Sequence, residues 1–163
     1  MSWYLGLVYF TQKGYSKLMT NNIRFIKAKD SDFDYLVALR KATMVPHLEN
    51  AGLFLTEAEH KARVLYELSS SHLIYVNEKR VGLAKFKQRE HDYYLFQLQI
   101  EPQQQGKGLG AQVIKSLIET HSKLPWILTV LKANPAKRLY EKLGFVQFDE
   151  DEYEFHYRRE PNP

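Results

Sequence analysis

The segment from residue 93 to residue 145 constrains the fold most, because strand and helix patterns alternate along it around a glycine-rich turn. An aromatic strand pattern over Tyr93–Ile100 precedes a loop over Pro102–Gly110, and Trp126–Leu131 is a short apolar run typical of a buried strand. Between the two strands, apolar residues recur at helical spacing: Leu109, Val113, Ile114, Leu117 and Ile118. A helix with one apolar face buries that face against the sheet that its neighbouring strands form. The segment therefore predicts an α/β (α+β) domain.

Strand and helix patterns also precede this segment. The alternating run Ile23–Ala28 predicts a strand, and we expect the helix after it to end near Pro46, because proline cannot continue the helical hydrogen bonds. Thr56 and Glu59 form a capping box for a second helix, which we expect to reach about Leu68. Two further strands are predicted on either side of a short turn: His72–Asn77 and Arg80–Lys87.

The last part of the chain predicts a helix and a hairpin. Asn134 followed by Pro135 is a favourable helix start, and Gly144 is typical of the residue after a helix end. Two alternating runs surround an acidic turn and predict a terminal hairpin: Phe145–Phe148 and Tyr153–Arg158. We therefore expect residues 19–163 to form a single domain, and we interpret residues 1–18 as an N-terminal extension of it.

Composition excludes several kinds of chemistry. The chain contains no cysteine, so it can have no disulfide bond, no cysteine-based zinc site and no thiol nucleophile. The absence of cysteine fits a cytoplasmic location, and we expect no metal. No apolar run is long enough to span a bilayer, so we expect no membrane association. The net charge of +4 is lower than a dedicated nucleic-acid binder usually carries, so we expect no nucleic-acid partner.

Residues 105–110 read Gln-Gly-Lys-Gly-Leu-Gly and lie between a predicted strand and an amphipathic helix. Glycine lets backbone N–H groups approach a ligand closely, and the start of the helix adds partial positive charge. Lys107 adds a full positive charge, so this turn suits a phosphate or pyrophosphate group. It matches neither the P-loop pattern G-x-x-x-x-G-K-[ST] nor the dinucleotide pattern G-x-G-x-x-G.

Two segments resemble signatures of the GNAT acetyltransferases. Gln105, Gly108 and Gly110 match the acyl-CoA loop of that family, Q/R-x-x-G-x-G/A. The segment from Asn134 to Phe145, which contains Leu-Tyr-x-x-x-Gly-Phe, resembles a second signature of the same family. The resemblance implies the GNAT fold, in which a mixed central sheet of six or seven strands is flanked by about four helices. It also implies that two central strands splay apart to form a cleft for acetyl-CoA.

The resemblance further implies which residues bind acetyl-CoA. The backbone of the turn would hold the pyrophosphate, and the backbone of the strand before it would bind the pantetheine arm. Asn134 resembles a family position near the pantetheine or the thioester, and its side chain can also cap its helix. Lys137 could meet the 3′-phosphate, or it could lie on a solvated helix face. The expected binding residues are Leu98, Gln99, Ile100, Gln105, Gly106, Lys107, Gly108, Leu109, Gly110, Ala111, Asn134 and Lys137.

Tyr140, inside the second signature, is the expected catalytic acid. A phenol with a pKa of about 10 stays protonated at neutral pH and could protonate the departing CoA thiolate. The alternative is a tyrosine whose ring only fills the core. Many relatives carry a glutamate base on the strand before the loop, whereas this strand has Gln97 and Gln99. We expect Gln97 to polarise a water molecule that takes the amine proton; the groups at residues 90–92 are alternatives.

The expected acceptor is a primary amine of a small molecule or a peptide. Without cysteine, we expect direct transfer in a ternary complex. Arg40, Met44 and His47 share one helix face, where Arg40 could hold a substrate carboxylate and His47 could move protons. Ordinary alternatives are a surface arginine, a core methionine and a loop-capping histidine. A non-catalytic acyl-CoA-binding or regulatory module is the alternative function, and the chain could form a homodimer.

Overall fold

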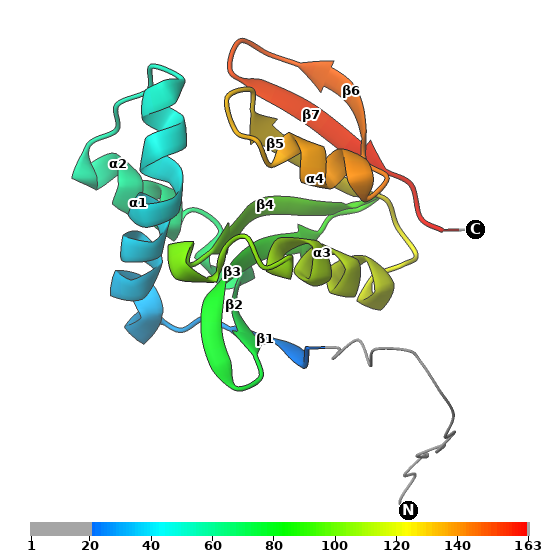
Figure 1. Ribbon diagram of the computed structural model, residues 1–163, viewed down its shortest axis with the longest axis horizontal. Helices are drawn as coiled ribbons and strands as arrows, with labels where there is room; N and C mark the ends of the chain where they lie inside the picture. Colours follow the sequence, from blue (N-terminus) through cyan, green and yellow to red (C-terminus); the bar gives the residue numbers. More distant parts are fainter. Residues whose placement is uncertain (1–20, 163) are drawn as a thin grey trace, which may run out of the picture.

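The computed structural model describes residues 21–162, so the expected extension over residues 1–18 lies outside the described residues. One seven-stranded mixed sheet has the strand order β1-β2-β3-β4-β5-β7-β6 (Figure 1). Its strands are β1 (Ile23–Lys27), β2 (Ser71–Val76), β3 (Lys79–Gln88), β4 (Tyr93–Ile100), β5 (Trp126–Leu131), β6 (Val146–Glu150) and β7 (Glu154–Arg159). The α-helices among the described residues are α1 (Phe33–Asn50), α2 (Glu57–Leu65), α3 (Leu109–Thr120) and α4 (Lys137–Lys142). The expected sheet of six or seven strands with about four helices is confirmed.

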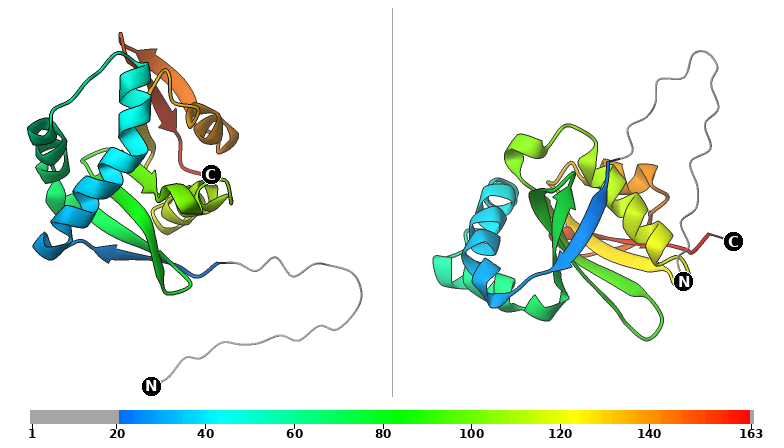
Figure 2. Two further views of the ribbon diagram at one scale, coloured as in Figure 1. Left: turned by 60° about the vertical axis from the view of Figure 1, so that its left-hand side comes forward. Right: turned by 90° about the horizontal axis from the view of Figure 1, so that it is seen from below.

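The helices cover both faces of the sheet (Figure 2). Helices α1 and α2 pack on one face, where they share a core cluster with β2 and β3: Leu36, Val37, Leu39, Val64, Leu73 and Leu83. Helices α3 and α4 pack on the other face, where the larger core cluster includes Val113, Ile114, Leu117, Ile118 and Tyr140. The residues that line α3 are those that the helical spacing predicts, because a period of 3.6 residues places them on one side.

Strands β4 and β5 are parallel, and they pair along only part of their length. Three residue pairs join them: Tyr93↔Trp126, Tyr94↔Ile127 and Leu95↔Leu128. Beyond Leu95 the register between β3 and β4 shifts, because Lys85 faces Gln97 while Phe86 faces Leu95 and Phe96 is left over as a bulge. A bulge bends its strand and increases the local twist. Strand β4 therefore diverges from β5 beyond Leu95, which confirms the expected splay of two central strands.

Helix α1 continues through Pro46 to Asn50, so the predicted end near Pro46 is wrong. Proline removes one backbone donor from a helix. The last turn nevertheless forms, because Leu48 is buried and its carbonyl accepts hydrogen bonds from the N–H groups of Ala51 and Leu53 at 3.0 and 2.9 Å. Tertiary packing at the end of α1 thus outweighs the local effect of the proline.

The other helix ends differ from the predictions by a few residues. The capping box of α2 is confirmed, since the N–H of Glu59 donates to Oγ1 of Thr56 at 3.3 Å. Helix α2 ends at Leu65, three residues before the expected end, and Glu67 beyond it has a φ of 52°. Regular α4 begins at Lys137, because the side chain of Asn134 caps a separate turn that precedes it.

Two partly buried histidines predict how stability depends on pH. His72 stacks on Phe86 with 4.6 Å between ring centroids, and His121 lies 4.8 Å from the ring of Tyr93. Burial lowers the pKa of both histidines. As the pH falls, these two histidines are therefore protonated at a higher pH in the unfolded chain than in the folded one. The folded state loses stability below about pH 6.5, the ordinary pKa of histidine.

Thermal denaturation between about pH 7.5 and about pH 5.5 measures this effect. We expect Tm to decrease toward acid, and His121→Phe to reduce that decrease. His91→Gln is a matched control, because His91 is exposed on the β3–β4 turn. An unchanged pH profile in His121→Phe would contradict this assignment.

Candidate active site

The glycine-rich loop and the start of α3 form a cavity of about 220 Å³ beside the end of β4. Its lining contains most of the predicted loop residues, but not Lys107, and adds Gln104 and Leu139. The lining residues are Ile100, Gln104, Gln105, Gly106, Gly108, Leu109, Gly110, Ala111 and Leu139. Gly108 has a φ of 74°, a left-handed conformation that residues with a Cβ rarely adopt. The N-terminus of the twelve-residue α3 opens here, so its unpaired N–H groups and its dipole favour an anion.

Two side chains hold this loop in place. Gln105 donates from Nε2 to the carbonyl oxygen of Ile100 at 2.9 Å, which ties the loop to the end of β4. Lys107 donates from Nζ to Oε1 of Gln104 at 3.2 Å and is exposed. The ammonium group of Lys107 thus lies beside the cavity, where it can contact an anion.

The second half of β4 offers backbone hydrogen-bonding groups to the opening between β4 and β5. The N–H of Glu101 donates to the carbonyl of Val81 at 2.8 Å, so residue 101 faces β3. Successive residues of a strand direct their N–H and C=O groups to alternate sides. Leu98 and Ile100 therefore direct theirs away from β3, toward β5. Since β5 pairs with β4 only as far as Leu95, this edge of β4 is open to an extended ligand.

Tyr140 lies on α4 with its ring buried against Phe145 at 5.7 Å between centroids. Within residues 21–162 its hydroxyl forms no hydrogen bond, whereas the hydroxyl of buried Tyr157 donates to Glu141 at 2.8 Å. Burial raises the pKa of Tyr140 to about 12. The phenol is thus protonated at neutral pH, and its proton is free to be donated to a ligand.

Asn134 and Lys137 lie at the start of α4. The side-chain Oδ1 of Asn134 accepts a hydrogen bond from the N–H of Ala136 at 2.9 Å, so this side chain acts as a cap. The ammonium group of Lys137 lies 5.1 Å from the centroid of the Phe155 ring, on β7. Lys137 does not line the cavity at the glycine-rich loop.

The side chains of Gln97 and Gln99 face the opposite side of the sheet from α3. Gln97 pairs with Lys85 and Gln99 with Leu83, and Leu83 belongs to the core beneath α1 and α2. Gln99 is almost fully buried, at 2% exposure. Both glutamines lie on β4, and neither side chain can accept a proton at neutral pH.

Helix α1 presents the predicted acceptor-binding residues to this same side of the sheet. Arg40 is only 5% exposed, so the alternative of a surface arginine is excluded. Met44 and His47 are partly buried on the following turns. The three alternative groups, at residues 90–92, lie elsewhere, in the turn before β4 at the end where β4 pairs with β5. Glu90 and His91 are exposed there, and Asp92 is partly buried and pairs with Arg89.

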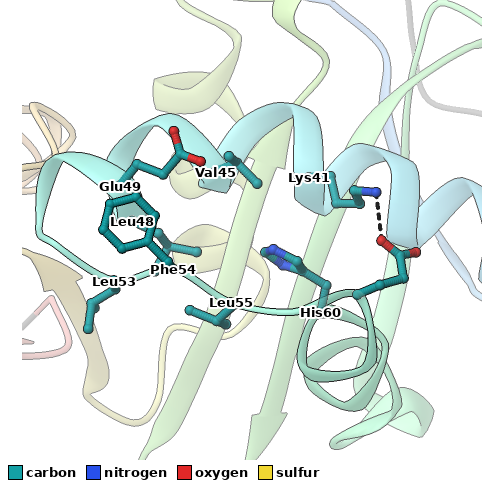
Figure 3. Close-up of a pocket in the computed structure, with 9 residues that line it drawn as sticks. Lys41, Val45, Leu48, Glu49, Leu53, Phe54, Leu55 and His60 are labelled. Atoms are coloured by element: carbon teal, nitrogen blue, oxygen red, sulfur yellow. Dashed lines mark hydrogen bonds and ion pairs between the residues drawn. The ribbon is translucent and has the colours of Figure 1, made fainter.

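A second cavity of about 300 Å³ lies between α1, the α1–α2 loop and α2 (Figure 3). Its lining combines apolar side chains with a few charged ones: Lys41, Val45, Leu48, Glu49, Leu53, Phe54, Leu55, Glu57 and His60. Lys41 and Glu57 form an ion pair at 2.6 Å across one end. This cavity is absent from the predictions, because a loop between two helices carries no local pattern that marks a cavity.

Two further buried residues, Lys85 and His60, were not predicted from the sequence. Lys85 is 1% exposed and donates from Nζ to three carbonyls at the end of α2, those of Arg63, Val64 and Tyr66. Its position two residues after Leu83 was the available signal, because alternate residues of a strand share one face.

None of the helices within residues 21–162 is long and apolar enough to cross a bilayer. In the same part of the chain, no group of three or more His, Cys, Asp or Glu side chains could hold a metal ion.

Comparison with known proteins identifies the family. A family model described as an acetyltransferase (GNAT) domain matches residues 45–159, whereas no curated protein matches the chain. The fold is similar to that of PaiA N-acetyltransferase from Thermoplasma acidophilum in complex with coenzyme A, at 18% identity over 85% of this chain and 99% of that one, with a TM-score of 0.67.

Two further solved structures have the same fold. One is an acetyltransferase from Thermus thermophilus, at 21% identity over 85% of this chain and 96% of that one, with a TM-score of 0.69. The other is the ribosomal-protein-S18-alanine N-acetyltransferase from Escherichia coli, at 18% identity over 86% of this chain and 93% of that one, with a TM-score of 0.63. Because the family model spans most of a domain that has the splayed sheet and the glycine-rich cavity, the chain belongs to the GNAT family of acetyltransferases.

Proposed function

We propose that this acetyltransferase moves an acetyl group from acetyl-CoA to a primary amine of a small molecule or a peptide, by direct transfer in a ternary complex. The observation that carries the proposal is the opening between β4 and β5, with an anion-binding loop at the end of β4 and an unbonded, protonated Tyr140 on α4. The coenzyme A complex of the similar Thermoplasma acidophilum protein supports acetyl-CoA as the co-substrate. The absence of cysteine supports direct transfer.

In this proposal, acetyl-CoA binds along β4 and the loop that follows it. The loop from Gln105 to Ala111 holds the pyrophosphate through backbone N–H groups and the start of α3. The open backbone edge at Leu98 and Ile100 binds the pantetheine amides in the manner of an added strand. Lys137 reaches the 3′-phosphate only by leaving the face of Phe155, and Asn134 contributes from its cap position.

The proposed reaction forms a C–N bond and breaks a C–S bond. The neutral amine attacks the thioester carbonyl, CoA leaves as a thiolate, and Tyr140 donates its proton to the sulfur. An alkyl ammonium has a pKa of about 10.4, so the acceptor must first lose a proton. With no carboxylate at Gln97, that proton passes to a water molecule held by the Gln97 amide and then to solvent. The second proton, which the attacking nitrogen loses when the amide forms, leaves by the same route. Solvent returns a proton to Tyr140 after the product leaves.

The glutamines on β4 favour one alternative, a non-catalytic acyl-CoA-binding or regulatory module. Calorimetry with acetyl-CoA, followed by measurement of CoA thiol release over a panel of amines and peptides, separates the two functions. Thiol release that depends on an acceptor supports the enzyme. Binding without release on any acceptor would support the module instead.

Gly108→Ala tests the proposed pyrophosphate site. A residue with a Cβ at a φ of 74° costs about 1–2 kcal/mol, so the loop must either bear that strain or turn its N–H groups away. We expect the Kd for acetyl-CoA to rise about tenfold, because 1.4 kcal/mol corresponds to a factor of about ten. Calorimetry measures the change, and Gly52→Ala, with a φ of 74° outside the site, is the control. An unchanged Kd in Gly108→Ala would remove the loop from the binding site.

The proposal includes a cytoplasmic location and neither nucleic acid nor membrane as a partner. A homodimer through the C-terminal hairpin also belongs to it. Strand β6 supports this, because it lies at the edge of the sheet and exposes Val146 and Phe148 by 68% and 57%.

A further inference from the structure

Arg40 is a buried charge for which residues 21–162 provide no ion-pair partner. It lies on the sheet-facing side of α1 with 5% of its surface exposed. Its Nε atom is fully buried and has no hydrogen-bond partner within residues 21–162. A buried ion normally has a partner, because removing it from water is costly. The contacts within residues 21–162 therefore do not compensate the cost of burying the Arg40 guanidinium.

The groups around Arg40 make its environment more positive. Burial, and after it the charge of Arg40, lowers the pKa of Lys85 to about 8. Burial and the neighbouring Arg63 lower the pKa of Arg40 itself to about 10. Burial and Arg40 also lower the pKa of His60, whose Nδ1 is buried without a partner in the described domain.

The nearby carboxylates of α2 and its C-terminal turn are already bonded elsewhere. Glu57 pairs with Lys41 at 2.6 Å, and Glu67 pairs with Lys87 at 2.5 Å. Glu59 accepts hydrogen bonds from the backbone N–H and the hydroxyl of Thr56. None of these three carboxylates is left to balance Arg40.

Unbonded amide groups lie on the same side of the sheet. Both amide atoms of Gln99 and Oε1 of Gln97 are buried without a hydrogen-bond partner among residues 21–162. Each unsatisfied buried polar group costs about 1–3 kcal/mol of desolvation. Helix α1 packs on β4, and Gln97 pairs with Lys85, the residue whose pKa the charge of Arg40 lowers, so these amides lie on the same face of the sheet as Arg40. Such a set of unpaired donors and acceptors is typical of a site that a polar ligand completes.

We propose that the acceptor amine carries a carboxylate, and that Arg40 binds this carboxylate beside the amides of Gln97 and Gln99. This inference rests on the proposed acetyl transfer and names the class of acceptor: a free amino acid or a short peptide. The planar guanidinium of arginine matches a carboxylate with two parallel hydrogen bonds. A dicationic amine is a poor acceptor, because Arg40 and Lys85 repel it.

The test compares acceptors that differ only in the carboxylate: an amino acid, its amide and its decarboxylated amine. We expect the wild-type enzyme to prefer the amino acid by about tenfold to a hundredfold in kcat/KM, which corresponds to a hydrogen bond to a charged group. Arg40→Met should lose this preference, and Arg40→Lys should keep part of it. The KM for acetyl-CoA should stay unchanged in both variants.

Arg63→Met is the matched control, because it removes a guanidinium from the same neighbourhood but from an exposed side chain. It should keep the preference. We also expect Arg40→Met to melt at a higher temperature than the wild type, because it removes an unbalanced buried charge. Equal rates with the amino acid and its amine, or an Arg40→Met variant that keeps the preference, would overturn the inference.

A binding measurement separates this inference from the proposed transfer. In the presence of CoA, N-acetyl amino acids should raise Tm of the wild type more than the matched N-acetyl amines do, and Arg40→Met should abolish the difference. That result supports the carboxylate site even if no acceptor is turned over. Stabilisation by CoA with no difference between the two ligand series would refute the carboxylate site and leave the CoA site intact.

Discussion

Tyr140→Phe is expected to lower kcat by about 10²- to 10⁴-fold, the usual contribution of a positioned general acid. The substitution removes only the hydroxyl, and the ring keeps its contact with Phe145. The KM for acetyl-CoA should change little, because the proton is donated when the C–S bond breaks and not when acetyl-CoA binds. Steady-state kinetics with saturating acceptor measures both parameters.

Stability separates a catalytic from a structural role of this hydroxyl. The Tyr140 hydroxyl has no hydrogen bond within the described domain, so Tyr140→Phe should change the free energy of unfolding by less than about 0.5 kcal/mol. Tyr157→Phe is the matched control, since its hydroxyl donates to Glu141 at 2.8 Å. That variant should lose about 1–2 kcal/mol of stability and keep its kcat. An unchanged kcat in Tyr140→Phe would remove Tyr140 from the mechanism.

Gly82→Ala is expected to have the largest effect on stability. Gly82 of β3 lies so close to β4 that an added Cβ would stand 2.0 Å from the carbonyl oxygen of Gln99. The obstacle is backbone, which cannot move aside as a flexible side chain can. Overpacking of this kind costs about 1–3 kcal/mol and sometimes more. We expect a loss of about 3 kcal/mol, or roughly 6–12 °C in Tm for a chain of this length.

The same substitution should weaken acetyl-CoA binding, because it displaces the half of β4 whose other edge faces the opening toward β5. Gly110→Ala is the stability control: its Cβ would meet only a methyl group of Leu139, at 3.3 Å. Alanine is also preferred to glycine within a helix, so Gly110→Ala should keep or raise Tm. A Gly82→Ala variant with a wild-type Tm would contradict this prediction, because it would mean that β3 and β4 accommodate the added methyl group without loss of stability.

Local patterns predicted most elements of this fold. Strands β4 and β5 have the predicted bounds, because the residues within each strand carry the signal. The glycine-rich loop was predicted for the same reason, since its residues are consecutive and precede an amphipathic helix. The predicted end of α1 at Pro46 failed, because the burial of Leu48 depends on contacts outside the helix.

The acceptor side could be predicted only in part. Helical spacing placed Arg40, Met44 and His47 on one face, but it left open whether Arg40 lies on the surface or in the core. Burial of Arg40 and its approach to Lys85 depend on how α1 packs against the sheet. Residues 40 and 85 are far apart in the chain, so no local period can connect them.

The sequence by itself determined the α/β element order, the anion-binding loop and the position of Tyr140 in a recognisable signature. These features depend on hydrogen bonds and side-chain periods within short segments. Only the tertiary structure decided where β4 leaves β5, and which buried groups of residues 21–162, the Tyr140 hydroxyl and the Arg40 guanidinium among them, have no partner in that part of the chain. Those features arise from the register between strands and from desolvation by distant elements, and both are properties of the assembled core.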